Sequence, residues 1–453
     1  MTADGDADLT YAWTEDKLDT TTYSVSENGT AITNQLSCAD PNLYDGEDNT
    51  VTWLSRSDWN GTLPTETVKL ALTEQLKKDL QDIRYDPADY EAVNLPAMGK
   101  NNGITLYDMI GLDYDDPKWD DLLDNLTFDE MNTLIGDAFH WTMPVKSIEA
   151  PGTRDENGPQ GLTASLLGSG ATQLTATAFT SEDVMAATFN TDLMTAVGTI
   201  IGNNCLSANI ACLYGPGNNI HRTPYSGRNF EYYSEDPFIS GKTCAAETAG
   251  IQSKGVYVYN KHFAFNDQET GRDGICVWTN EQAAREIYLQ AFEYPIADAN
   301  AYCVMTSFNR LGATWAGGDY NLITNILRGE FGMPGFVLTD FSNNNAFMDV
   351  IQGLLAGGDG WDCNDASKWT AKLKTYSDDP QVVSAMREAT KHILYTVANS
   401  NAMNGMGFNT IVEEVHGWWQ DAITYGQIGT GVLAALFLVI AILDSRKAKK
   451  QAT

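Results

Sequence analysis

Between about residue 115 and about residue 405, short apolar segments alternate with longer amphipathic segments. The apolar segments have the length of strands and end in polar or aromatic residues, whereas the amphipathic segments have the length of helices. We expect strands at residues 210–215, 256–263, 301–308 and 335–341, with helices such as 280–299 and 321–331 between them. This alternation predicts an α/β fold with a parallel sheet, and its length suits a (β/α)8 TIM-type barrel. The carboxyl ends of the strands would then carry the chemistry.

The composition excludes some kinds of partner. Of 453 residues, 43% are hydrophobic, which is enough to bury a large core. The formal net charge of −32 would repel a phosphate backbone, so we expect no nucleic-acid partner. The seven cysteines lack metal-ligand or redox spacing, and most lie in apolar surroundings that predict buried thiols. No metal and no organic cofactor is implied.

The two ends of the sequence differ in character. Residues 1–13 contain neither a basic region nor an apolar stretch, so they do not resemble a signal peptide. Residues 425–444 are long and apolar enough for a transmembrane helix, and the basic residues after them predict a cytoplasmic C-terminus. The alternative is a buried C-terminal helix. An external barrel needs an export signal, so we expect either a natural start upstream of Met1 or a missing part of the protein.

Six regions follow from these patterns. Thr127 and Glu130 form a predicted capping box, and residues 66–83 form a predicted amphipathic helix. The regions are 1–65, a short strand-containing piece; 66–114, a connector with a helix; 115–405, the barrel; 406–424, a linker; 425–444, the transmembrane helix; and 445–453, a basic cytoplasmic tail. The predicted protein is thus a single-pass cell-membrane protein with an extracellular barrel.

Four sequence blocks, in their order along the chain, resemble the barrel domain of glycoside hydrolase family 3. They are "LYGPGNNIHRTPYSGRNFEYYSEDPFISGK", "KHFAFNDQETGR", "VMTSFNRLG" and "ILRGEFGMPGFVLTDFSNN". The last block matches the family's active-site signature at Arg328, Glu330, Gly335, Thr339, Asp340 and Asn343. The resemblance also implies that residues 1–65 are the remnant of an α/β sandwich domain that precedes the barrel.

This resemblance implies roles for particular residues. Asp340 would be the nucleophile of a retaining glycosidase, and the sugar hydroxyls would be bound by Arg228, Lys261, His262 and Arg272. Met305 would line the pocket wall. The spacing of eleven from Lys261 to Arg272 matches the family's pattern.

Each of these residues also has a simpler structural interpretation. Asp340 alone could be a helix N-cap. The basic residues could form ion pairs that tie loops together, for example with Glu231, Glu235 or Asp236, while His262 and Met305 could be core residues.

Three positions depart from the family's pattern. Asn157 stands where the family has an aspartate that binds sugar hydroxyls, so a charge-assisted hydrogen bond is lost, although Asp155 could compensate. Phe308 replaces a frequent tyrosine whose hydroxyl contacts the nucleophile, and Phe341 replaces a frequent tryptophan. These changes bear on rate and sugar preference and leave the nucleophile in place.

The prediction is an exo-acting, retaining β-glycosidase that hydrolyses β-glucosides or related β-glycosides. The resemblance places the general acid in the sandwich domain, largely outside this chain, and the text after Phe263 lacks the glycine-rich segment of the β-N-acetylglucosaminidase branch. The alternatives are a noncatalytic carbohydrate-binding pseudoenzyme barrel and a structural cell-surface protein. The sugar, the linkage and the oligomeric state stay open.

Overall fold

A computed structural model describes residues 24–44, 51, 53, 71–163, 176–342, 347–404 and 417–451. Asn343 of the signature and most of residues 1–65 lie outside the described residues. The chain divides into two compact units, Met1–Thr410 and Ile411–Thr453.

The α-helices are α1 Glu74–Leu80, α2 Lys118–Leu123, α3 Phe128–Gly136, α4 Glu182–Ala186, α5 Thr191–Ser207, α6 Pro237–Gln252, α7 Glu281–Ala283, α8 Gln290–Ala299, α9 Val350–Leu355, α10 Ala366–Lys374, α11 Pro380–Ala398 and α12 Trp418–Gln451. The strands are β1 Trp141–Thr142, β2 Thr153–Asn157, β3 Cys212–Tyr214, β4 Tyr257–Val258, β5 Asn260–Phe263, β6 Cys276–Val277, β7 Val304–Thr306, β8 Arg310–Leu311, β9 Thr314–Trp315 and β10 Val337–Leu338.

Parallel strands joined by helices make up the centre of the larger unit, so the predicted mixed α/β fold is confirmed. β2, β3 and β4 pair in parallel, and so do β5, β7 and β10. All four predicted strands are present, and the one expected at residues 256–263 is split into β4 and β5. Helix α6 connects β3 to β4, and α8 connects β5 to β7, as a parallel sheet requires.

The eight-stranded barrel itself is not confirmed. β1 pairs with β2 in the antiparallel direction, because the connection between them is too short for a helical crossover. Beyond β10, Leu338 bridges Gly360 in parallel. The Trp361 amide then donates to the Ile135 carbonyl over 2.9 Å, and the Ala138 amide donates to the Trp361 carbonyl over 3.3 Å. The segment after β10 therefore pairs with the segment that precedes β1.

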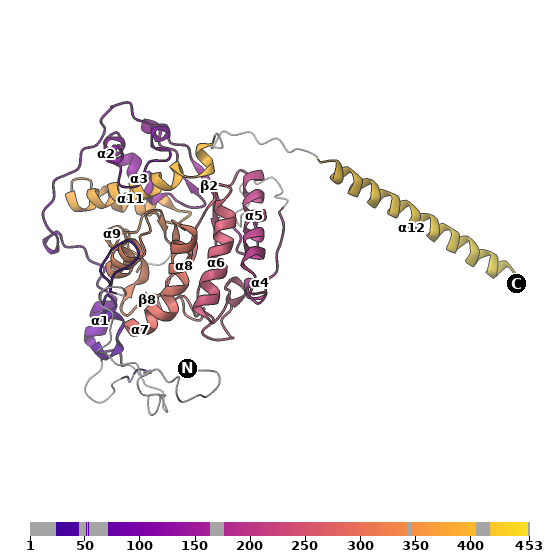
Figure 1. The fold of residues 1–453 in the computed structure, drawn as a ribbon, viewed down its shortest axis with the longest axis horizontal. Helices are drawn as coiled ribbons and strands as arrows, with labels where there is room; N and C mark the ends of the chain where they lie inside the picture. The colour runs from indigo at the N-terminus through magenta and orange to yellow at the C-terminus, as the bar shows by residue number, and fades with distance from the viewer. Residues whose placement is uncertain are drawn as a thin grey trace, which may run out of the picture. The chain divides into compact units, whose positions relative to one another are not determined.

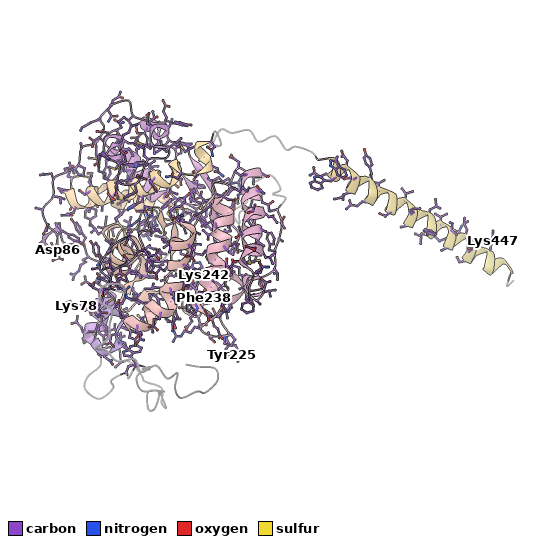
Figure 2. All side chains as sticks on the ribbon, viewed as in Figure 1. Lys78, Asp86, Tyr225, Phe238, Lys242 and Lys447 are labelled. Carbon is purple, nitrogen blue, oxygen red and sulfur yellow. The ribbon has the colours of Figure 1, made fainter. Side chains whose placement is uncertain are left out.

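Helices α5, α6 and α8 lie side by side on one flank of the unit (Figure 1). Gly198 of α5 makes the close approach possible, since a Cβ atom there would lie 2.1 Å from the Glu247 carbonyl oxygen of α6. Between α6 and α8, the Lys242 Nζ lies 2.5 Å from an Asp298 carboxylate oxygen. Figure 2 labels Lys242 together with Phe238, its neighbour one turn earlier on α6. These contacts hold the helices that flank β3, β4 and β7.

Several local predictions can be compared with the structure. The capping box of Thr127 and Glu130 is confirmed at the start of α3. Among the described residues, the helix predicted at 66–83 is confined to Glu74–Leu80, because the Thr73 side chain accepts the Leu76 amide and caps it there. All seven cysteines are free thiols, and they are buried except at Cys38 and Cys276, which are half-buried.

An N-terminal segment, residues 24–39, packs on the flank formed by α7 and the helix Asn321–Glu330. The amides of Gln35 and Leu36 donate to the Glu281 carboxylate at 3.2 and 2.7 Å. The Thr30 hydroxyl donates to the Gly329 carbonyl at 2.9 Å. This segment therefore belongs to the larger unit, far in sequence from the helices that hold it.

The second unit contains α12. Its residues Trp418–Lys447 have a mean hydropathy of 2.2 over the most apolar window, and none of that window is buried. This helix is long and apolar enough to cross a membrane by length and composition.

Candidate active site

Asp340 lies two residues past the end of β10. Its backbone amide donates to the Thr306 carbonyl at the end of β7, over 3.2 Å. One carboxylate oxygen accepts the Phe341 amide at 2.8 Å, while the other is buried and accepts no hydrogen bond from the described residues. The N-cap of the next helix, α9, is Asp349, whose side chain accepts the amides of Ile351 and Gln352. The N-cap interpretation of Asp340 is therefore wrong.

A cavity of about 450 Å³ opens beside the Asp340 carboxylate. Its walls come from the ends of β2, β3, β5, β7 and β10 and from the loops that follow them. Eight of the nine predicted site residues line it, namely Asn157, Arg228, Lys261, His262, Arg272, Met305, Asp340 and Phe341. The ninth, Phe308, is buried outside the lining, with the Arg272 guanidinium 4.8 Å from the centre of its ring.

Three cations and two carboxylates form a network on one side of the cavity. Arg228 binds the Glu231 carboxylate through two nitrogens, at 2.7 and 3.1 Å, and Lys261 Nζ lies 3.8 Å from the same carboxylate. Arg272 lies 3.1 Å from Glu269. The ion pairs predicted as the alternative are thus present for Glu231, and the same residues also line the cavity. Ion pairing and a place at the cavity are compatible, because fixed ion pairs orient the donors that face the cavity. The binding of sugar hydroxyls by these residues stays a prediction.

Opposing effects set the charges in this network. Burial acts to raise the pKa of Glu231, but Lys261 and Arg228 outweigh it and lower that pKa below its ordinary value. Burial lowers the pKa of Lys261, with Glu231 acting against the shift. For Asp340, burial raises the pKa, and Arg228, Arg272 and Lys261 oppose the rise. The cations therefore help to keep the Asp340 carboxylate ionised in a buried place.

His262 connects the network to Asp340. Its Nε2 lies 3.6 Å from the unpaired Asp340 oxygen, and its Nδ1 lies 3.1 Å from the Tyr232 hydroxyl. Burial, together with Arg228, Lys261 and Arg272, lowers the pKa of His262 well below its ordinary value, so the ring is neutral. The Asn266 amide donates to the Tyr232 hydroxyl at 3.3 Å, which leaves that hydroxyl free to donate to Nδ1. With Nδ1 accepting from Tyr232, we assign the proton of His262 to Nε2, the nitrogen on the side of Asp340.

The remaining predicted residues fill the apolar and amide parts of the wall. Met305 is 3% exposed and belongs to the main hydrophobic core as well as the cavity lining, so its two predicted roles coincide. Phe341 is 38% exposed, and its ring centre lies 5.7 Å from that of Phe139. These two rings form an apolar surface at the cavity.

Asp155 does not compensate for Asn157. Asp155 lies two positions before Asn157 on β2, further from the carboxyl end of the strand, and it is buried in the protein interior. There one of its oxygens accepts from Thr153 and Tyr257, each at 3.2 Å. It does not line the cavity. Burial raises its pKa to about 7.

Stability near neutral pH should therefore depend on Asp155. Because the folded-state pKa is raised, the stability linked to its proton is fully present below the unfolded pKa and is lost as the pH rises toward about 7. Between pH 4 and pH 8 the wild type should lose about 3 to 4 kcal/mol of unfolding free energy through Asp155. Asp155→Asn, which lacks this carboxyl group, should not show that loss. Urea titrations at both pH values measure this. Asp192→Asn, the same charge change at an exposed position on α5, should show the same loss as the wild type.

The cavity also contains ionisable residues outside the predicted site set, including Glu231, Glu269 and Asp362. The two glutamates had a sequence signal, since each lies three residues from a predicted arginine and can pair with it locally. Asp362 had none, because only the pairing of Leu338 with Gly360 brings it to the cavity. Among the described residues, no group of three or more His, Cys, Asp or Glu side chains has the arrangement of a metal site.

Known proteins resemble this chain in the same region. Residues 162–355 match the family described as Glycosyl hydrolase family 3 N terminal domain. A beta-glucosidase of Ruminococcus albus is 45% identical over 161 residues, which are 36% of this chain and 17% of that protein. An exo-alpha-(1->6)-L-arabinopyranosidase of Bifidobacterium breve is 38% identical over 224 residues, which are 48% of this chain and 30% of that protein.

A solved structure of a beta-glucosidase also resembles this chain. Beta-glucosidase 3B from Thermotoga neapolitana, in complex with glucose, aligns with a TM-score of 0.60 and 28% identity, covering 64% of this chain and 44% of that one. The chain thus spans less than half the length of these relatives. The matched region contains the cavity-lining residues from Tyr214 to Phe341. The matched region of this chain, residues 162–355, thus belongs to glycoside hydrolase family 3.

Proposed function

We propose that this chain carries the sugar-binding site and the nucleophile of an exo-acting, retaining β-glycosidase that acts on β-glucosides or related β-glycosides. The observation that carries the proposal is the unpaired, buried oxygen of Asp340, which faces a cavity ringed by Arg228, Lys261 and Arg272. A cavity of about 450 Å³ is within the range of small-ligand sites, which favours binding of one terminal sugar unit.

In the proposed reaction, the Asp340 carboxylate attacks the anomeric carbon. The bond from that carbon to the leaving oxygen breaks, the leaving group takes the electron pair and a proton, and a glycosyl ester of Asp340 forms. Water then hydrolyses the ester and restores the carboxylate, with net retention of configuration. His262 Nε2–H, 3.6 Å from the carboxylate, would orient it for attack.

The other wall residues would bind the sugar. Arg228 and Lys261 present donors to its hydroxyls, and their ion pairs with Glu231 fix the direction of those donors. Asn157 supplies an uncharged amide where the family has a carboxylate. Phe341 and Phe139 would pack against the apolar face of the ring.

The general acid is proposed to come from outside this chain. Of the carboxylates in the cavity, Glu231 is held ionised by Arg228 and Lys261, so it has no proton to give. The relatives are more than twice as long as the part that aligns with this chain, which leaves room for a further domain that supplies the acid.

An activated substrate tests the proposal with the chain in hand. The dinitrophenolate of a 2,4-dinitrophenyl β-glucoside leaves without protonation, so the nucleophile alone should release it. We expect a burst of dinitrophenol about equal to the protein concentration, followed by slow turnover. The corresponding β-xyloside and α-L-arabinopyranoside compare sugar preference. The absence of any Asp340-dependent burst with all three substrates contradicts the proposal.

A closed TIM-type barrel at residues 115–405 is part of the same proposal. The parallel pairing of β2 with β3, of β5 with β7 and of β7 with β10 supports it. The hydrogen bonds of Trp361 with Ile135 and Ala138 extend this pairing beyond β10. The flanking regions are proposed as above: a sandwich-domain remnant at 1–65, a connector at 66–114, and a linker at 406–424.

We also propose that residues 425–444 of α12 span the cell membrane, with the barrel outside and the basic tail 445–453 in the cytoplasm. The length and hydropathy of the helix and the lysines and arginine after it support this. The full chain should sediment with membranes and resist extraction at high salt, whereas a chain that ends at Asn404 should not sediment. Equal amounts of the two in the soluble fraction would contradict the proposal.

A further inference from the structure

Asp362 lies beside Asp340 on the wall of the cavity. Leu338 and Gly360 are paired in parallel. Asp340 lies two residues after Leu338, and Asp362 lies two residues after Gly360. The Asp362 amide donates to the Thr339 hydroxyl at 2.9 Å, and the Ser342 amide donates to the Asp362 carbonyl at 2.8 Å, so the register continues. Neighbouring parallel segments lie about 4.8 Å apart, and residues in register point to the same face. Both aspartates line the cavity.

The Asp362 carboxyl group lacks a hydrogen-bond partner on one side. The residue is 4% exposed, and its buried Oδ1 has no hydrogen bond to any described residue. A buried polar atom at a cavity wall is destabilising if it is left unpaired. A ligand hydroxyl in the cavity could supply the missing bond.

The surroundings of Asp362 disfavour a negative charge. Burial, and then the charges of Asp340 and Asp155, raise the pKa of Asp362 well above its ordinary range, and the opposing effect of Lys261 is smaller. Lys261 Nζ also lies 3.8 Å from the Glu231 carboxylate, so its positive charge acts on Glu231 as well as on Asp362. Tyr214 and Cys363 are further ionisable groups near Asp362, and because their own pKa values are raised, both are neutral.

We propose that Asp362 is a neutral carboxylic acid that hydrogen-bonds a hydroxyl of the sugar bound against Asp340, and that it thereby positions this sugar. The inference rests on the proposed function, since it takes a sugar as the ligand of the cavity. A carboxylic acid both donates and accepts, which matches a sugar hydroxyl.

The position of Asp362 favours binding over proton transfer to the leaving group. In a retaining glycosidase the two catalytic carboxyl groups flank the glycosidic bond. Asp362 shares one wall with Asp340, on the adjacent segment and in register with it. It is therefore placed to contact the same side of the sugar as the nucleophile does.

Binding of D-glucose, measured by calorimetry with the full chain, tests the inference. At pH 7, Asp362→Ala should weaken binding roughly tenfold or more, because a hydrogen bond is lost and its partner is left unpaired. Asp362→Asn is the matched variant: its amide also donates and accepts, so it should retain most of the affinity. Wild-type affinity should fall as alkaline pH ionises Asp362, and the fall should be smaller in Asp362→Asn, which keeps Lys261, Asp340 and Asp155.

A second readout is independent of sugar binding. The infrared spectrum of the wild type at pH 7 should contain the carbonyl band of a protonated carboxylic acid that Asp362→Asn lacks. Absence of that difference, unchanged glucose affinity in Asp362→Ala, or no glucose binding by the wild type would each overturn the inference. So would a fall of about a hundredfold in the dinitrophenol burst rate of Asp362→Asn at unchanged affinity, since that would place Asp362 in the chemical step instead of in sugar binding. If glucose binding depends on Asp362 but no Asp340-dependent burst occurs, the inference stands and the hydrolytic function fails.

Discussion

Asp340→Asn is expected to lower the rate of dinitrophenol release from the activated β-glucoside by at least about a thousandfold. An amide is a far poorer nucleophile than a carboxylate, so the glycosyl ester does not form. Asparagine has the same shape and can still accept the Phe341 amide, which Asp340 accepts at 2.8 Å. Glucose affinity should therefore change much less than the rate. The measurement is the burst rate in stopped flow, with calorimetry as the binding control.

External anions give a sharper version of this experiment. Asp340→Gly removes the carboxylate and leaves space beside the cavity, where azide can attack the anomeric carbon in its place. Azide should restore dinitrophenol release and yield the α-glucosyl azide, because one displacement inverts the configuration. Met305→Leu is the control, because this variant changes another residue of the cavity wall and keeps the Asp340 carboxylate. Azide should not restore activity in it in this way. A β-configured azide product from Asp340→Gly would assign the nucleophile to another residue.

Arg328→Met is expected to have the largest effect on stability. Arg328 donates to the carbonyls of Gly335 and Gly357 at 2.9 Å each and lies 2.8 Å from the Asp359 carboxylate, which is fully buried. Removing one partner of a buried ion pair leaves an uncompensated charge, which costs about 3 to 5 kcal/mol. Urea unfolding at pH 8 measures the loss. Arg84→Met, at an arginine that is 81% exposed and 3.8 Å from Asp82, should cost less than about 1 kcal/mol.

The pH dependence of this loss provides an internal check. His392 Nδ1 lies 2.8 Å from Asp359, and burial together with the positive charge of Arg328 lowers the pKa of His392. In Arg328→Met that repulsion is absent, so His392 can take a proton and pair with Asp359 at lower pH. The loss of stability should thus be smaller at pH 5 than at pH 8. An equal loss at both values would show that His392 does not respond to the missing charge.

The same ion pair also positions the site. The Val337 amide donates to Asp359 at 2.7 Å, so Arg328 and Asp359 hold the segment that leads to Asp340 against the segment that leads to Asp362. Glu330 accepts from Arg285, which joins the end of the helix Asn321–Glu330 to the segment after α7. Arg328, a signature residue that a sequence match associates with the active site, therefore acts through backbone placement.

The sequence by itself predicted the order of strands and helices, the strand end that carries Asp340, and most of the residues that meet at the cavity. It could do so because apolar periodicity and local charge spacing are properties of neighbouring residues. The resemblance to glycoside hydrolase family 3 followed from the blocks around Arg228, Lys261 and Asp340 in the same way.

Only the tertiary structure decided which of these residues face the cavity. Phe308 packs against the Arg272 guanidinium outside the cavity lining, and Asp155 is buried in the interior two positions before Asn157, which lines the wall. Asp362 joins Asp340 through the pairing of Leu338 with Gly360, and Asp349 takes the capping role that Asp340 could have had. These outcomes depend on register between distant segments and on burial. Neither is encoded in the spacing of adjacent residues, because a shift of one residue reverses the face to which each side chain points.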